Sequence, residues 1–426
     1  MKSKINIVFI LILILSSIVL ISCSTTHKIK RDFKQKNSEN SFFKGFVLYN
    51  PETKKELISY NGQKYFTPAS NTKLFTFYTA YKTLGDSIAS LAYLKRKDSL
   101  IIKGTADPSF LYDFDSTKTI NFLKNKKESI YLVDATINET PYGSGWAWDD
   151  YEYYYMPEKN LFPVYGNIIK FSLTDSLINT TPSYFKQKIT VLDSITIHRE
   201  FNENKFHLQK GTIRENKIPF ITSNLLVANL LGEILKKDIQ LIPDSEKYAN
   251  WKILRSIKSD ELYKKMLVES DNFIAEQLML QVGKEVSNLY SVKLAIKYSL
   301  ENYLPNLPQK PRWVDGSGLS RYNLFTPNDF IFLLNKMYKE IPLQKLLNYF
   351  PVGGETGTLK NWDKNKKPYI FAKTGSLSNN YNLSGYLITK KGTVLIFSYM
   401  NNHYQKSTSI VKSDIENTLK KIYNTY

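Results

Sequence analysis

Residues 67–73 and the apolar stretch that follows them restrict the possible folds more than any other part of the chain. Apolar residues recur at helical spacing through positions 74–84, and Pro68 stands where the chain would enter that helix. Ser70 then falls in the first turn and Lys73 one turn later, on the same face. A serine hydroxyl is a weak nucleophile until a base removes its proton, and an amine of lowered pKa can do so. The spacing therefore predicts a serine–lysine nucleophile pair at the start of a helix.

The same spacing occurs a second time, from Ser183 to Lys186, where we interpret it as an ordinary surface pair. A motif this short does not assign a function by itself. Its meaning depends on what else the chain carries.

Length and charge narrow the classes of protein. A chain of 426 residues has room for two or three folded units, and 42% hydrophobic with 23% charged residues is typical of a globular protein. The formal net charge is +19, but the lysines are spread along the chain, without an arginine-rich arm or an aromatic RNA-binding motif. This pattern favours a solvated basic surface that faces an anionic envelope, and we expect no nucleic-acid partner.

The N-terminus has the pattern of a targeting signal. Lys2 and Lys4 precede an apolar run over residues 7–21, which ends at Cys23. This predicts a secretory signal over residues 1–22, too short for a confident membrane-spanning helix. Because Cys23 is the one cysteine of the chain, no internal disulfide can form.

The letters Leu-Ile-Ser-Cys at residues 20–23 resemble the lipobox of bacterial lipoproteins. The resemblance implies lipidation of Cys23, which would anchor the protein to a membrane on the periplasmic side of the cell envelope. Ser24 favours the outer membrane. A plain signal peptide or an uncleaved anchor is the alternative.

The remaining chain divides by its patterning. Residues 23–42 are polar and lysine-rich, which indicates a tether. Residues 43–85 begin with two apolar runs around a polar turn, a predicted β-hairpin that leads into the helix described above. Residues 86–257 carry short strand-like runs and no sustained helical period before residue 225, so we expect an inserted strand-rich region. Residues 258–426 resume with amphipathic helices, a strand over 369–372, a hairpin over 383–400 and a last helix.

Two further motifs stand at the boundaries of predicted elements. Ser270 and Asn272 form a Ser-x-Asn triplet at a break between two helical segments. Lys373-Thr374-Gly375 occurs once in the chain, at the end of a predicted strand. Glycine-rich loops are expected over residues 313–323 and 350–359.

Ser-x-x-Lys, Ser-x-Asn and Lys-Thr-Gly, in this order, are the three motifs of penicillin-recognising serine enzymes. The surrounding letters Pro-Ala-Ser-Asn-Thr-Lys-Leu, Asp-Gly-Ser-Gly-Leu-Ser-Arg-Tyr-Asn and Ala-Lys-Thr-Gly-Ser-Leu resemble the class C low-molecular-mass penicillin-binding proteins, over residues 42–405. These are D-alanyl-D-alanine carboxypeptidases and endopeptidases. The resemblance implies an α+β fold in which an antiparallel sheet is flanked by helices. Residues 43–85 and 258–426 would form this penicillin-binding domain, interrupted by the strand-rich insertion.

The resemblance also implies an acyl-enzyme mechanism on peptidoglycan stem peptides. Ser70 would attack the carbonyl of the penultimate D-alanine while Lys73 takes its proton. Ser270 would relay a proton to the leaving D-alanine, and Asn272 would orient the substrate amide. Penicillins and other β-lactams would acylate the same serine.

The third motif supplies the carboxylate-binding and oxyanion groups of the family. Lys373 would keep Lys73 poised and, with Thr374, bind the terminal carboxylate. Gly375 belongs to the same substrate-binding strand. The backbone N–H groups of Ser70 and Ser376 would hold the developing oxyanion.

A side site is implied for the amino-acid end of a diaminopimelate side chain. Trp146, Asp149 and Tyr154 match it by their spacing in the insertion, and Arg321 matches the arginine of the Gly-Leu-Ser-Arg loop. Arg321 would bind a carboxylate and Asp149 an ammonium group. A purely structural aromatic loop is the alternative for residues 143–151.

Two other functions remain open at this stage: a β-lactamase or esterase of the same fold, and a non-catalytic peptidoglycan-binding lipoprotein. No cofactor is expected. We also expect no metal, because the four histidines at positions 27, 198, 207 and 403 lack the usual ligand spacing. The chain has no Gly-x-Ser-x-Gly segment.

Overall fold

The computed structural model describes residue 31 and residues 41–426, apart from 175–176, 194–197, 210–212, 246, 249 and 364–366. The predicted signal segment 1–22, the lipidation site Cys23 and nearly all of the predicted tether 23–42 lie outside the described residues. Within the described ranges, no helix combines the length and apolarity that a membrane crossing requires.

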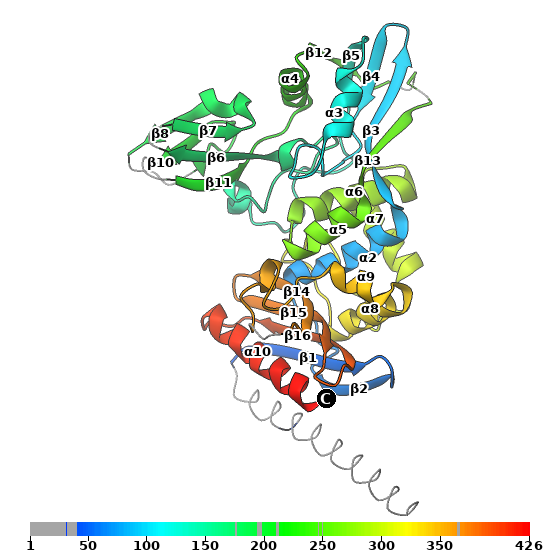
Figure 1. Ribbon diagram of the computed structural model, residues 1–426, viewed down its shortest axis with the longest axis vertical. Helices are drawn as coiled ribbons and strands as arrows, with labels where there is room; N and C mark the ends of the chain where they lie inside the picture. The colour runs from blue at the N-terminus through cyan, green and yellow to red at the C-terminus, as the bar shows by residue number, and fades with distance from the viewer. Residues whose placement is uncertain are drawn as a thin grey trace, which may run out of the picture.

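A five-stranded antiparallel sheet joins the two ends of the chain (Figure 1). Its strands, in spatial order, are β14 (Ile370–Leu377), β15 (Asn380–Ile388), β16 (Val394–Asn402), β1 (Phe43–Asn50) and β2 (Lys55–Tyr60). The predicted hairpins β1–β2 and β15–β16 are confirmed. Between them, β1 pairs with β16 so that Val47 lies opposite Ser398.

Both faces of this sheet are covered by other elements. Successive side chains of each strand point to opposite faces, so they enter two different clusters. Leu395 and Phe397 pack in one cluster with helix α10 (Thr408–Thr425), whose contributing side chains are Val411, Ile415, Leu419 and Ile422. Ile396, which lies between them in sequence, belongs to the larger core on the other face. The alternation explains why the strands are apolar at nearly every position.

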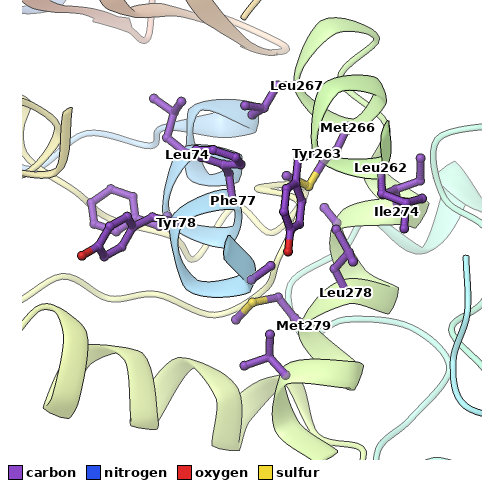
Figure 2. Packing of buried hydrophobic residues seen from close by; sticks show 14 of the residues in the cluster. Leu74, Phe77, Tyr78, Leu262, Tyr263, Met266, Leu267, Ile274, Leu278 and Met279 are labelled. Atoms are coloured by element: carbon purple, nitrogen blue, oxygen red, sulfur yellow. The ribbon is translucent and has the colours of Figure 1, made fainter. Parts of the chain in front are cut away.

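The opposite face of the sheet meets a layer of helices with α2 (Lys73–Thr83) at its centre. Around α2 lie α5 (Ser259–Val268), α6 (Asn272–Ser287), α7 (Val292–Tyr298), α8 (Pro327–Glu340) and α9 (Leu343–Asn348). Every residue of α2 from Lys73 to Ala80 is buried. Figure 2 shows Phe77 facing Tyr263, and the two rings meet edge to face with centroids 5.5 Å apart. Each buried aromatic contributes about 2–3 kcal/mol from area alone, so this packing fixes the position of the helix.

Residues 86–257 form three further sheets. The largest has five strands in the order β12-β5-β4-β3-β13 and lies with α3 (Thr117–Lys124) and α4 (Asn224–Leu235) beyond the helical layer (Figure 1). Its strands are β12 (Ile239–Pro243), β5 (Ser129–Asp134), β4 (Ser99–Lys103), β3 (Ser87–Arg96) and β13 (Lys252–Lys258). Two three-stranded sheets follow in the orders β11-β6-β7 and β8-β10-β9. Their strands are β6 (Ile168–Thr174), β7 (Leu177–Thr181), β8 (Ile189–Leu192), β9 (His198–Arg199), β10 (Phe206–Gln209) and β11 (Ile213–Pro219).

The chain enters and leaves this region at one place. Ser87, at the start of β3, pairs with Lys258, at the end of β13, and the Ser259 N–H donates to the Asp86 carbonyl at 3.0 Å. The helices α2 and α5 therefore belong to one layer, although residues 86–257 separate them along the chain.

The strands predicted over residues 100–102, 130–133 and 168–171 are confirmed as parts of β4, β5 and β6. The strand-rich pattern expected before residue 225, with no sustained helical period, gave no sign of α3, which lies there. This helix has eight residues, of which Thr119 and Leu123 are buried. Two buried positions are too few to produce a sustained helical period in the sequence.

Candidate active site

Ser70 lies in a single turn of 3-10 helix, η1 (Ala69–Thr72), which runs directly into α2. Lys73 is the first residue of α2 and is fully buried. Its Nζ donates to Ser70 Oγ at 2.9 Å, to Asn272 Oδ1 at 2.6 Å and to the Ser317 carbonyl at 2.7 Å. The lysine therefore joins the first motif to the second and to the loop around residue 317.

Burial lowers the pKa of Lys73 to about 8, because the charged ammonium loses its hydration. Asp315, Asp271 and Glu276 oppose this shift, since their negative charges favour the protonated amine. At pH 7 roughly a tenth of such lysines are neutral. A neutral amine at hydrogen-bond distance from a serine hydroxyl is able to act as its base.

The second motif occupies the break between α5 and α6. Ser270 adopts a φ of +62°, a conformation that non-glycine residues adopt rarely and that is strained. Asp271 then caps α6 by accepting from the Ile274 N–H at 2.9 Å. Asn272 donates through Nδ2 to the Tyr155 carbonyl at 2.8 Å, so an insertion residue helps to orient it.

The third motif lies on β14, at the edge of the antiparallel sheet. Lys373 Nζ donates to Ser270 Oγ at 2.8 Å and to the Thr374 carbonyl at 2.8 Å. Burial, and second the charge of Lys73, hold the pKa of Lys373 well below its usual value. Thr374 donates through Oγ1 to Thr358 Oγ1 at 2.8 Å.

Two glycines let these segments touch the nucleophile turn. A Cβ on Gly375 would lie 2.3 Å from the Pro68 carbonyl oxygen, and a Cβ on Gly318 would lie 1.9 Å from that of Ala69. Gly318 also has a φ of +81°, which L side chains rarely adopt. Any side chain at either position would push the strand or the loop away from Ser70.

These segments surround a cleft of about 520 Å³. Its lining includes residues of all three motifs, namely Ser70, Ser270, Asn272, Thr374 and Ser376. The insertion contributes Tyr112, Asp113, Asp150, Tyr154, Tyr155 and Lys217. The cleft therefore lies where the insertion meets the two parts of the catalytic region.

The predicted side site is brought together only in part. Arg321 and Tyr154 line the cleft, whereas Asp149 and Trp146 are absent from its lining. Trp146 instead donates through Nε1 to Asp315 Oδ2 at 2.9 Å. The acidic residue that lines the cleft is Asp150, which accepts from the Tyr155 hydroxyl at 3.0 Å. The sequence could not decide between two adjacent aspartates, because the 3-10 turn η2 (Trp148–Glu152) sets which one faces the cleft.

Asp315 is a buried carboxylate that holds the loop in place, and none of the three motifs contains it. Its carboxylate accepts from the Gly318 N–H at 2.9 Å and the Ser320 N–H at 2.6 Å, in addition to Trp146. Asn323 donates a further bond at 2.7 Å. An aspartate directly before a Gly-Ser-Gly turn is the signal that could have identified it.

Glu276 is a second buried carboxylate missed from sequence. It lies one turn after Asn272 on α6 and accepts from the Ser317 N–H at 2.7 Å. Burial and the nearby charge of Asp315 raise the pKa of Glu276 to about 7. Since the Ser317 carbonyl accepts from Lys73, Glu276 and Lys73 are linked through the backbone of one residue, Ser317.

Within the described chain, the one group of three or more histidine and acidic side chains whose ligand atoms converge contains no residue of the three motifs. It lies in the insertion and is considered separately below.

Known proteins resemble this chain in both sequence and structure. The sequence profile of the D-Ala-D-Ala carboxypeptidase 3 (S13) family matches residues 27–425. The D-alanyl-D-alanine carboxypeptidase DacB of Haemophilus influenzae is 25% identical over 433 aligned positions, which cover 88% of each chain. A D-alanyl-D-alanine carboxypeptidase of Actinomadura is 24% identical and is covered over 79% of its length.

A solved structure of penicillin binding protein 4 from H. influenzae superposes with a TM-score of 0.76 at 21% identity, covering 92% of this chain and 99% of that one. The likeness confirms the predicted α+β fold.

Proposed function

Because the chain belongs to the D-Ala-D-Ala carboxypeptidase 3 (S13) family, among the class C penicillin-binding proteins, and is a serine-type D-alanyl-D-alanine carboxypeptidase/endopeptidase, we propose that Ser70 is its acylated nucleophile. The observation that carries the proposal is the buried Lys73 amine, 2.9 Å from Ser70 Oγ and with a pKa lowered to about 8. The substrate is the stem peptide of peptidoglycan.

In the first half-reaction, Lys73 takes the proton of Ser70 as Oγ attacks the carbonyl carbon of the penultimate D-alanine. The oxyanion that forms is held by the backbone N–H groups of Ser70 and Ser376, and each such donor is worth about 3–4 kcal/mol in the transition state. The peptide C–N bond then breaks. Its nitrogen receives a proton through Ser270, whose Oγ accepts from Lys373 at 2.8 Å.

In the second half-reaction, a water attacks the ester on Ser70 and the C–O bond to the serine breaks. The proton of the water passes to the base and then back to Ser70. A β-lactam would acylate the same oxygen and leave slowly, because its ring-opened product stays in the cleft.

The edge strand β14 would hold the substrate backbone. Val352 bridges Phe371 at one end of β14, and beyond Lys373 the described residues place no other strand on its outer side. An extended peptide can add to such an edge through main-chain hydrogen bonds. The substrate carboxylate would then meet Thr374 and Lys373, and its charge would raise the lowered pKa of Lys373.

We assign the diaminopimelate end of the stem peptide to Arg321 and Asp150, with Tyr154 beside them. Arg321 suits the carboxylate and Asp150 takes the role of ammonium partner that spacing alone assigned to Asp149. Trp146 supports this site by fixing Asp315 instead of contacting the substrate.

For the location of the enzyme, we propose secretion through residues 1–22, lipidation of Cys23 and a tether over residues 23–42. Residues 43–85 and 258–426 would form the catalytic domain around the inserted residues 86–257. The S13 family match supports an envelope location, because the proposed substrate is part of the cell wall. Fractionation of cells that express Cys23→Ala tests the anchor. We expect this variant to be released from the outer-membrane fraction.

The enzymatic proposal is tested with a defined cross-linked muropeptide and its pentapeptide monomer. We expect Ser70→Ala to abolish release of D-alanine, cleavage of the cross-link and labelling by a fluorescent penicillin. Ser183→Ala is the matched control, because Ser183 and Lys186 repeat the same spacing on the surface, where Ser183 donates to Glu233. Labelling that survives in Ser70→Ala would contradict the assignment.

A further inference from the structure

A group of side chains in the insertion takes no part in the mechanism above. His198, on β9, lies directly opposite His207, on the antiparallel strand β10. Glu200 follows His198 by two positions, and the Glu200 N–H donates to the Lys205 carbonyl at 2.9 Å, which continues the ladder. Because side chains alternate along a strand, all three lie on one face of the hairpin.

The ligand atoms of these three residues lie within 4.8 Å of one another. His207 Nε2 is 2.8 Å from Glu200 Oε1, and His198 Nε2 is 3.9 Å from the same oxygen. Ligands of a tetrahedral Zn²⁺ with bonds of about 2.0–2.1 Å stand about 3.3 Å apart. The two imidazoles, whose rings stack with centroids 5.2 Å apart, need to swing inward by roughly 1 Å to meet one ion.

A fourth residue completes the pattern seen around metal-bound histidines. Glu152, from the turn η2, approaches His198 Nδ1 at 3.2 Å, on the side of the ring away from Glu200. A carboxylate at the second nitrogen fixes the tautomer that leaves Nε2 free to bind a metal. Two carboxylates and two neutral imidazoles also balance the charge of a divalent cation.

The side chain of Arg199 points away from this cluster. Arg199 lies between His198 and Glu200 in sequence, so its side chain projects from the opposite face of the strand. There its guanidinium stands over the ring of Tyr151, 4.9 Å from the centroid, and donates to the Glu200 carbonyl at 2.8 Å. One positive side chain, Lys205, does fall on the face that His198, Glu200 and His207 share, because it precedes His207 by two positions. Its Nζ pairs with Glu203 Oε2 at 2.6 Å, and the charge of Glu200 also acts on it.

We propose that His198, Glu200 and His207 bind one divalent transition-metal ion of the Zn²⁺ class, with water as the fourth ligand. The imidazole and carboxylate donors suit Zn²⁺ better than Mg²⁺ or Ca²⁺, which prefer oxygen alone. The spacing of the three residues along the chain matches no typical metal-binding motif. Their ligand atoms converge only because of the register between β9 and β10, which the sequence does not show.

The ion would have a structural role at the cleft. Through Glu152 it would tie the hairpin to η2, the same turn that carries Asp150 to the cleft wall. Tyr151 reinforces the junction, since its hydroxyl donates to the Arg199 carbonyl at 3.1 Å. The ion takes no part in the bond-breaking steps, so its binding can be measured apart from the peptidase activity.

The test is titration of the purified, metal-stripped protein with Zn²⁺ by calorimetry, and with Co²⁺ by visible absorption, which reports the coordination geometry. We expect one ion per chain, bound at micromolar concentration or tighter. His207→Ala and Glu200→Gln should each weaken binding more than 100-fold, and Glu152→Gln should weaken it 10–100-fold as an outer partner. His403→Ala, which removes an exposed histidine directly after β16, is the matched control and should change nothing.

Two results would overturn the proposal: no saturable one-to-one binding by the unaltered chain, or binding in Glu200→Gln and His207→Ala as tight as in His403→Ala. Because Glu200→Gln preserves size and the side chain is half exposed, it keeps the test valid if a histidine variant folds poorly. Penicillin labelling of each variant through Ser70 reports whether the catalytic domain is intact.

Discussion

Lys73 and Lys373 are two amines buried in one cleft, and each makes a hydrogen bond to a different serine. Taking both ammonium groups out of water is costly, and this cost lowers the pKa of both amines. In the proposed mechanism, the lowered pKa of Lys73 supplies a base without a histidine. It also makes the activity depend on pH in a defined direction.

In the proposed mechanism the neutral form of Lys73 is the base, and the neutral fraction grows as the pH rises toward the Lys73 pKa of about 8. We therefore expect kcat/KM for acylation to rise about tenfold per unit below pH 8 and to level off above it. Stopped-flow acylation by a chromogenic cephalosporin between pH 5.5 and 9.5 measures the profile. A rate that is flat across pH 6–8 would exclude Lys73 as the base.

The carboxylate of Glu276 favours the protonated form of Lys73. Glu276→Gln retains an acceptor for the Ser317 N–H but removes the charge, so the pKa of Lys73 should fall further. The rising limb of the pH profile should then move to lower pH, by a few tenths of a unit to about one unit. Glu285→Gln, on an exposed position of the same helix, should leave the profile unchanged. A shift to higher pH would show that Glu276 acts in another way.

The meeting of the three motifs in one cleft could be predicted from the sequence, because each motif is short and each stands at the end of one element. Asp150 could not, since its neighbour Asp149 has the same chemistry and only the turn η2 distinguishes them. Glu276 and Asp315 act through backbone groups of residues 315–320, and no local pattern reports such a contact.

At the scale of elements, the site depends on close approach between the Asp315–Ser320 loop and η1. Gly318→Ala would place a Cβ 1.9 Å from the Ala69 carbonyl and strain a φ of +81°. Gly392→Ala is a matched control, because Gly392 has a φ of +88° and open space around it. We expect the control to cost about 1 kcal/mol and Gly318→Ala to cost several, with loss of penicillin labelling. Chemical denaturation measures both, and equal costs would refute the clash.

Trp146 connects the insertion to the same loop. Trp146→Phe keeps an aromatic ring but removes the donor to the buried Asp315, which should cost about 1–3 kcal/mol. It should also raise KM for muropeptides, because Arg321 follows Ser320, whose N–H donates to Asp315. Trp148→Phe, at a position 74% exposed, is the control and should change neither quantity. If both variants behave alike, the hydrogen bond has no positioning role.

Long elements with a clear period, such as the hairpins and α6, were predictable from the chain because their own residues determine them. The short helix α3 and the two-residue pairing of β9 with β10 were not, since long-range packing decides them.

For the whole molecule, 58 basic side chains outnumber 39 acidic ones, and we expect most of this excess positive charge to be solvated. We expect binding to isolated, polyanionic cell walls to weaken several-fold as NaCl rises from 50 to 300 mM, because salt screens charges beyond about 10 Å. Co-sedimentation measures the bound fraction. The hydrolysis of a small soluble muropeptide should change much less, and equal salt effects on both would contradict an electrostatic role of the surface.

The pairing of the first strand with the last, β1 against β16, has a consequence for biosynthesis. The ribosome must synthesise the chain through residue 402 before β1 can pair with β16, so assembly of this sheet comes late and involves high contact order. A message cut short at Gly392 would still encode Ser70, Lys73, Ser270, Asn272 and Lys373. It would lack the strand that holds β15 to β1, and its product would present unpaired edges that favour aggregation.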